Sequence, residues 1–76
     1  MSLATDDTDN TQQRSIQSIE VGFRLIRALE MAPAHLPLKV LAEKAGMTPA
    51  KAHLYLVSFV RLGLVAQDAR TSHYGL

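Results

Sequence analysis

The chain has 76 residues, about half the length of an average domain, so we expect one small domain or a piece of a larger protein and not a multidomain enzyme. Apolar residues make up 47% of it, a normal fraction for a folded protein, and the lack of cysteine excludes a disulfide framework or a thiolate zinc site. No apolar run approaches the roughly 18 residues that span a bilayer, and no signal segment opens the chain, so we expect a cytoplasmic protein without a membrane partner.

Charge is divided unevenly along the chain. Asp6, Asp7 and Asp9 lie in a Thr-, Asp- and Gln-rich opening without apolar periodicity, so residues 1–15 are expected to be a flexible tail. From Arg14 onward the chain holds all eight Lys and Arg residues against four of the seven acids, a net charge of +4. The folded part, residues 16–76, keeps seven of these eight cations against the same four acids and is basic. This charge favours an anionic partner, although a solvated surface is the common alternative.

The first periodic segment begins at Ser18, a good helix N-cap, and ends before Pro33, which cannot continue a helix. One face carries apolar residues at three- and four-residue spacing and is expected to be buried: Ile19, Gly22, Phe23, Ile26 and Leu29. A second apolar face holds Val21, Leu25 and Ala28. We interpret this second face as a dimer interface; the alternative is that it packs under the rest of the domain or the tail.

Two further helices follow in close succession. The first begins after Pro37, buries Leu38, Leu41, Ala42 and Ala45, and ends at Gly46, where a left-handed residue is needed. The second has Thr48 as N-cap and Pro49 at its first position, extends over residues 49–62 and ends at Gly63. Its apolar face holds Ala52, Tyr55, Leu56, Phe59 and Leu62. Two helices joined by so tight a glycine-containing turn are typical of a helix-turn-helix.

The C-terminal residues predict a β hairpin. Residues 64–67 and 73–76 are expected to be strands around a polar turn at 68–72, and the region 36–38 is expected to pair with this hairpin. The predicted fold is therefore mainly α with a small hairpin, a winged helix-turn-helix with its wing at 64–76. Its expected core is Ile19, Phe23, Ile26, Leu41, Ala52, Leu56, Phe59, Leu62 and Tyr74.

Three segments carry a resemblance to a known family. They are Ser18–Glu20, Leu38–Met47 and Leu62–Val65, and over roughly residues 17–76 the chain resembles the N-terminal DNA-binding domain of IclR-type bacterial transcriptional regulators. The resemblance implies an operator of double-stranded DNA, a homodimer, and a nucleoid-associated protein. It also implies a larger C-terminal domain, absent from these 76 residues, that binds a small-molecule effector, and it allows a tetramer of the parent protein. Where the family has a His-Arg pair in the recognition helix, this sequence has His53 and Leu54.

Helix geometry selects the residues expected to contact DNA. With Ala52 and Leu56 turned inward, the start of the outer arc enters the major groove, so Lys51 and His53 are expected to bond guanine or phosphate, and Ala50 and Leu54 to meet thymine methyl groups. Thr48 and the first-turn amides suit a phosphate. The wing tip and the basic end of the tail suit the neighbouring backbone or minor groove. The predicted DNA-binding set is Arg14, Ser18, Thr48, Ala50, Lys51, His53, Leu54, Arg70 and Thr71.

Catalytic function is not expected. His35, His53 and His73 lack metal-ligand spacing, and the sequence has neither a nucleophile elbow nor a phosphate-binding glycine loop, so we expect no cofactor and no metal. The alternative from another class is a winged-helix protein-interaction module, in which Leu54 and Val57 bind a protein partner instead of DNA.

Overall fold

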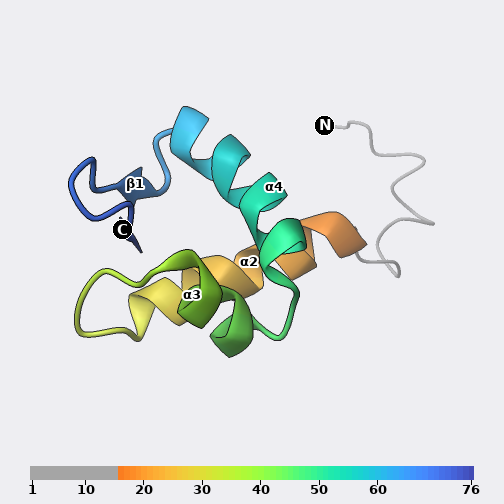
Figure 1. The fold of residues 1–76 in the computed structure, drawn as a ribbon. Coiled ribbons are helices and arrows are strands. Elements are labelled where there is room, and N and C mark those ends of the chain that lie inside the picture. Colours follow the sequence, from red (N-terminus) through yellow and green to blue (C-terminus); the bar gives the residue numbers. More distant parts are fainter. Residues whose placement is uncertain (1–15) are drawn as a thin grey trace.

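A computed structural model describes residues 16–76 of the chain. Three helices come first, α2 (Gln17–Glu30), α3 (Leu38–Ala45) and α4 (Pro49–Arg61), and a hairpin of β1 (Ala66–Gln67) and β2 (Tyr74–Gly75) follows (Figure 1). The predicted order and class of the elements are confirmed. None of the described helices is long and apolar enough to cross a membrane.

Helix α2 begins one residue before the predicted N-cap. Its N-cap is Ile16, whose side chain has no hydrogen-bonding group, and Ser18 lies within the first turn, so the prediction of a Ser18 cap is wrong. The helix ends at Glu30, and the N–H of Met31 closes the last turn by donating to the Arg27 carbonyl over 3.1 Å. The chain is thus already out of the helix when it reaches Pro33.

The buried side of α2 combines residues of both predicted faces. Gly22 and Leu29 are buried as predicted, and so are Val21 and Leu25, which were assigned to a dimer interface. Leu25 is 0% exposed and Val21 6%, whereas Ile19 is 66% exposed and Phe23 50%. Gly22 explains this orientation, because a Cβ atom there would lie 2.9 Å from both the Phe59 and Tyr55 rings of α4. With Gly22 against α4, Leu25 turns into the core cluster that α2 shares with α3 and α4, and Val21 is buried as well. Ala28 is half-buried against the same core, so the predicted spare face is a core face.

The helix-turn-helix forms as its turn chemistry predicts. Gly46 ends α3 in the left-handed region at φ 74°, and the hydroxyl of Thr48 accepts a hydrogen bond from the Lys51 N–H over 3.2 Å at the start of α4. Ala42 is completely buried, as close approach of α3 and α4 requires. Gly63, at φ 79°, turns the chain out of α4.

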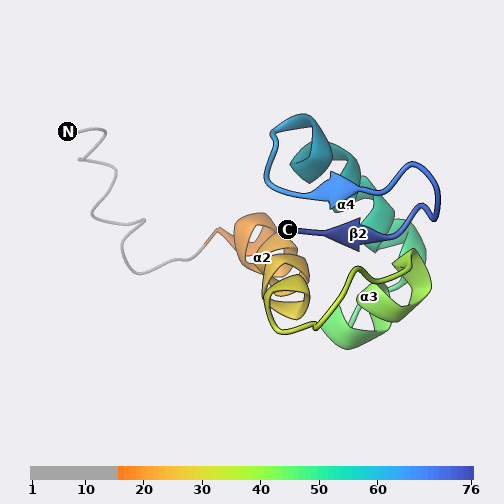
Figure 2. The same ribbon diagram turned by 90° about the vertical axis from the view of Figure 1, so that its left-hand side faces the viewer.

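The hairpin is joined to the segment between α2 and α3. Within it, Ala66 pairs with Gly75 and Gln67 with Tyr74 in antiparallel register (Figure 2). Leu36 forms an antiparallel bridge to Tyr74, with N–H to O distances of 2.9 and 2.8 Å in the two directions. Pairing of the 36–38 region with the hairpin is therefore confirmed, although both strands are shorter than predicted.

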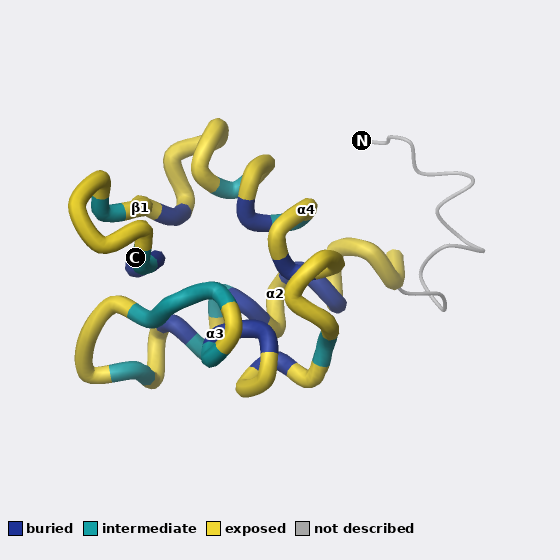
Figure 3. The backbone as a smooth tube through the Cα atoms, in the orientation of Figure 1, coloured by how far each residue is buried: buried dark blue, intermediate teal, exposed yellow. Residues whose placement is uncertain are grey.

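The core lies where the three helices and the hairpin converge (Figure 3). Leu41, Ala52, Leu56 and Tyr74 are buried as predicted, and Ile26 and Phe59 pack against the core in part. Three predicted core residues are exposed instead: Ile19, Phe23 and Leu62. Leu62 is 71% exposed because the chain turns at Gly63, and Val65 fills the core after the turn.

Candidate nucleic-acid interface

The outer side of α4 presents a stripe of residues that the core does not use. Ala50, Leu54, Val57 and Arg61 follow at four-, three- and four-residue spacing, which places them on one side of the helix, and all four are exposed. Leu54 is 71% exposed and Val57 44%. The predicted outer arc of the recognition helix therefore has the orientation that the spacing implied.

Lys51 and His53 flank this stripe on opposite sides, and both are exposed. His53 lies on the side facing the hairpin, where a groove of about 200 Å³ is lined by His53, Leu56, Val57, Val60, Arg61, Gln67 and Tyr74. Because this groove is lined from both α4 and the hairpin, the outer face of the helix and the wing form one continuous surface.

The N-terminal end of α4 offers fewer amide donors than the sequence analysis expected. Pro49 has no N–H, the Lys51 N–H donates to the Thr48 hydroxyl, and the Ala52 N–H donates to the Thr48 carbonyl over 2.9 Å. Among the described residues, the Ala50 N–H has no hydrogen-bond partner. One backbone amide and the hydroxyl proton of exposed Thr48 are thus left to meet an anion.

The tip of the hairpin is held by Asp68. Its carboxylate accepts hydrogen bonds from the N–H groups of Arg70, at 2.7 Å, and Thr71, at 3.3 Å, and these bonds lower the pKa of Asp68. The Ser72 N–H donates to the Asp68 carbonyl over 2.7 Å, with Ser72 in the left-handed region at φ 65°. The side chains of Arg70 and Thr71 are exposed at this ordered tip, and the Thr71 hydroxyl accepts from the His73 N–H over 3.1 Å.

Two predicted contact residues do not join this surface. Ser18 is exposed on α2, but it lines a different groove, on the Tyr55 and Phe59 side of α4. Arg14 lies outside the described residues. The residues that the structure brings together are therefore the predicted members of α4, its N-cap and the hairpin tip.

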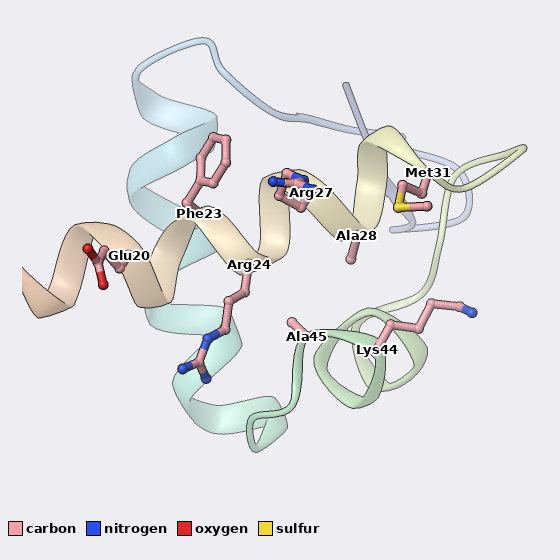
Figure 4. Close-up of a pocket in the computed structure, with 8 residues that line it drawn as sticks. All are labelled: Glu20, Phe23, Arg24, Arg27, Ala28, Met31, Lys44 and Ala45. Carbon is pink, nitrogen blue, oxygen red and sulfur yellow. The ribbon is translucent and has the colours of Figure 1, made fainter.

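A second group of cations lies on α2 and α3, and the sequence analysis did not single it out. A hollow there is lined by Glu20, Phe23, Arg24, Arg27, Ala28, Met31, Lys44 and Ala45 (Figure 4). Arg24, on α2, lines this hollow together with Lys44 of α3 (Figure 4). Arg27 lies 3.9 Å from the Glu30 carboxylate and 6.0 Å from the centre of the Phe23 ring. The positive charge of the domain is thus spread over more than one face.

Comparison with known proteins agrees with this architecture. The sequence profile of the IclR helix-turn-helix domain matches residues 18–69. The chain is also similar to the crystal structure of Pseudomonas aeruginosa HmgR, with 39% sequence identity and a TM-score of 0.76, over 80% of this chain and 25% of that chain. A comparison with curated proteins finds no significant match. The chain therefore spans about a quarter of the length of HmgR, and it belongs to the IclR helix-turn-helix family, the DNA-binding domains of transcriptional regulators.

Proposed function

We propose that this domain recognises a duplex operator by placing α4 in the major groove and the hairpin on the adjacent backbone or minor groove. The observation that carries the proposal is the groove lined from both α4 and the hairpin, together with the exposure of Lys51 and Arg61 on α4 and of Arg70 at the hairpin tip. A helix fits the major groove of B-form DNA, and an ordered basic loop beside it reaches the neighbouring phosphates. Its proposed place of action is the bacterial nucleoid.

Each residue of this surface has a proposed role. Lys51 and His53 bond guanine edges or phosphates, and Leu54 lies among the bases. Thr48 and the Ala50 N–H meet one phosphate at the end of α4. Arg70 and Thr71 contact the backbone from the wing, and Arg14 contacts it from outside the described residues.

The DNA-binding proposal is tested by a salt titration with a random-sequence duplex. If about three or four phosphates are neutralised by each subunit, log K falls with log salt at a slope of about −3 per subunit. Lys51→Gln is expected to reduce this slope by about one, whereas Glu43→Gln, on α3, leaves it at least as steep. A slope near zero would show that the domain does not bind DNA through phosphates, and it would favour the protein-interaction module.

We further propose that two copies bind a two-fold symmetric operator, in contact through a groove between α2 and α4. This groove replaces the interface predicted at Val21, Leu25 and Ala28, because those residues belong to the core. It has a volume of about 520 Å³ and is lined by Ser18, Ile19, Phe23, Ile26, Tyr55, Ser58, Phe59 and Leu64. Ile19, Phe23 and Leu64 are each at least 50% exposed in the single chain.

The size of this apolar surface favours a second copy that associates weakly. Three side chains exposed to this extent offer on the order of 300 Å² per copy, well below the roughly 800 Å² per partner of a stable interface. Association in solution is therefore expected to be weak, and a symmetric DNA site that holds both copies close together compensates for it. The two recognition helices would then lie about one helical turn apart.

Sedimentation with and without a palindromic duplex tests the dimer. Phe23→Glu places a charge in the groove and is expected to abolish two-copy occupancy of the duplex while single-copy binding remains. Met31→Glu is the matched control, since Met31 is 79% exposed at the C-cap of the same helix and does not line the groove. If Phe23→Glu and Met31→Glu give the same two-copy occupancy, the groove is not the interface.

A further inference from the structure

The stripe on the outer face of α4 is apolar where a DNA-reading helix usually carries hydrogen-bonding side chains. Its first three members are Ala50, Leu54 and Val57; the polar side chains near them are Lys51 and His53 at the flanks and Arg61 at the C-terminal end of the stripe. Helix α4 contains no Asn, Gln, Asp or Glu, and its single Arg is in its last position. The centre of this face therefore makes apolar contacts and no hydrogen bonds.

The chemistry of the base edges limits what such a face can distinguish. In the major groove thymine presents a methyl group and one acceptor, and guanine presents two acceptors. Adenine presents one acceptor beside an amino group and cytosine an amino group, and an amino group is read by an acceptor. The Lys51 ammonium has three donors and no acceptor, and the side chains of Ala50, Leu54 and Val57 have neither donors nor acceptors. A neutral His53 has one acceptor, but His53 lies at the edge of the outer arc, where it lines the groove shared with Gln67 and Tyr74.

We infer that this domain reads its half-site mainly through thymine methyl groups that Leu54 contacts, with guanine as the base that Lys51 prefers. This inference rests on the proposed function, because it requires α4 to lie in the major groove. Leu54 is central to it: 71% of its surface is open to solvent, and it lies in the second turn of the helix, between Ala50 and Val57 on the stripe. When a thymine methyl group packs against this side chain, the methyl group and the leucine surface are both removed from contact with water, which favours binding.

The inference is tested with duplexes selected by the full chain from a random-sequence library at low salt. In the selected duplex, each thymine is replaced in turn by deoxyuridine, which lacks the methyl group and keeps all hydrogen-bonding atoms. Loss of one buried methyl contact is expected to weaken binding about fourfold. The weakening is expected at one or two thymines of each half-site and at none of the flanking thymines.

A double-mutant cycle assigns the contact to Leu54. In Leu54→Ala the deoxyuridine effect is expected to fall to less than about 1.5-fold, because the side chain that packs on the methyl is gone. Leu62→Ala is the matched control, since Leu62 is also 71% exposed and lies beyond the end of α4; it is expected to keep the fourfold effect. His53→Ala is also expected to keep it, which separates methyl contact from hydrogen bonding by the imidazole.

The outcomes separate this inference from the proposed function. The inference is supported if the selected half-sites contain a thymine whose replacement by deoxyuridine weakens DNA binding by the unchanged protein. The same replacement must leave DNA binding by Leu54→Ala unaffected. A clear consensus that tolerates deoxyuridine at every position, or an effect that persists in Leu54→Ala, overturns it while DNA recognition stands. Absence of any binding to the library overturns both.

Discussion

The orientation of α2 is open to a direct test by truncating one residue from each of its two apolar faces. Leu25 is 0% exposed and lies in the core cluster with Leu29, Leu41 and Leu56, whereas Phe23 is 50% exposed. Leu25→Ala removes a fully buried side chain and leaves a cavity that the three helices cannot close completely. Phe23→Ala removes more atoms, but about half of their surface already contacts water.

The expected costs differ enough to be measured. A buried Leu→Ala change lowers the free energy of unfolding by about 2–5 kcal/mol. A domain of this size has a total free energy of unfolding of about 3–9 kcal/mol, so Leu25→Ala is expected to be marginally stable or unfolded. For Phe23→Ala we expect the free energy of unfolding to fall by about 1 kcal/mol. Half of the Phe23 surface is already exposed in the folded protein, and its cation–π contact with Arg27, at 6.0 Å, is weak.

Urea unfolding followed by circular dichroism of the helices measures both changes. Leu25→Val is included in case Leu25→Ala does not fold. It keeps most of the buried volume, and its expected cost is about 1 kcal/mol. The reasoning is refuted if Phe23→Ala costs as much as Leu25→Ala, since the face of α2 that carries Ile19 and Phe23 would then be the buried one.

Three further predictions concern the turn, the wing and the outer face of α4. Gly46→Ala is expected to lower the free energy of unfolding by about 1–2 kcal/mol. The cost comes from left-handed backbone strain alone, because no atom lies within 4 Å of the added Cβ, and Gly46→Asn is expected to cost less. Equal urea midpoints for the unchanged protein and both variants would contradict this prediction. The lowered pKa of Asp68 means that its carboxylate stabilises the fold above its ordinary value of 3.8 and that this contribution is lost as the pH falls through the folded-state pKa. Thermal unfolding of Asp68→Asn is therefore expected to depend less on pH than that of the unchanged protein between about pH 5 and pH 2, and parallel curves would show that the hydrogen bonds at the hairpin tip are not formed. Leu54→Arg is expected to fold normally, because Leu54 is 71% exposed, and to tighten binding to random duplex DNA by about 1 kcal/mol in a fluorescence titration; unfolding would show that Leu54 is buried.

The parts of the fold that depend on local chemistry could be predicted from the sequence. The end of α3 at Gly46 and the start of α4 at Thr48 and Pro49 depend on backbone conformation and hydrogen bonding within a few residues. The exposure of the stripe on α4 followed from the same helix, once Ala52 and Leu56 were placed inward. These predictions required no knowledge of how the helices pack.

The orientation of α2 could not be predicted in this way, because the helix has two apolar faces with the same periodicity. The face with Ile19, Phe23 and Leu29 was expected to be buried from its spacing, and of these three only Leu29 is buried. The packing instead depends on the small residue: Gly22 admits the rings of Tyr55 and Phe59, and this contact turns Val21 and Leu25 inward. The clue was a glycine within a helix, where it costs stability unless close packing requires it. The error also moved the proposed dimer contact, since the residues left exposed are Ile19 and Phe23.

The backbone bridge between Leu36 and Tyr74 closes the segment that contains the helix-turn-helix into a ring. The segment between these two residues contains α3, the turn, α4 and β1, and the two backbone hydrogen bonds of the bridge fasten its ends. The ends of so long a segment meet only at a considerable entropic cost, so we expect the ring to close late in folding, after α3 and α4 have packed. Once it is closed, the wing is tied to the entrance of α3 by main-chain bonds. A contact that draws the wing toward DNA therefore pulls on both ends of the helix-turn-helix at once.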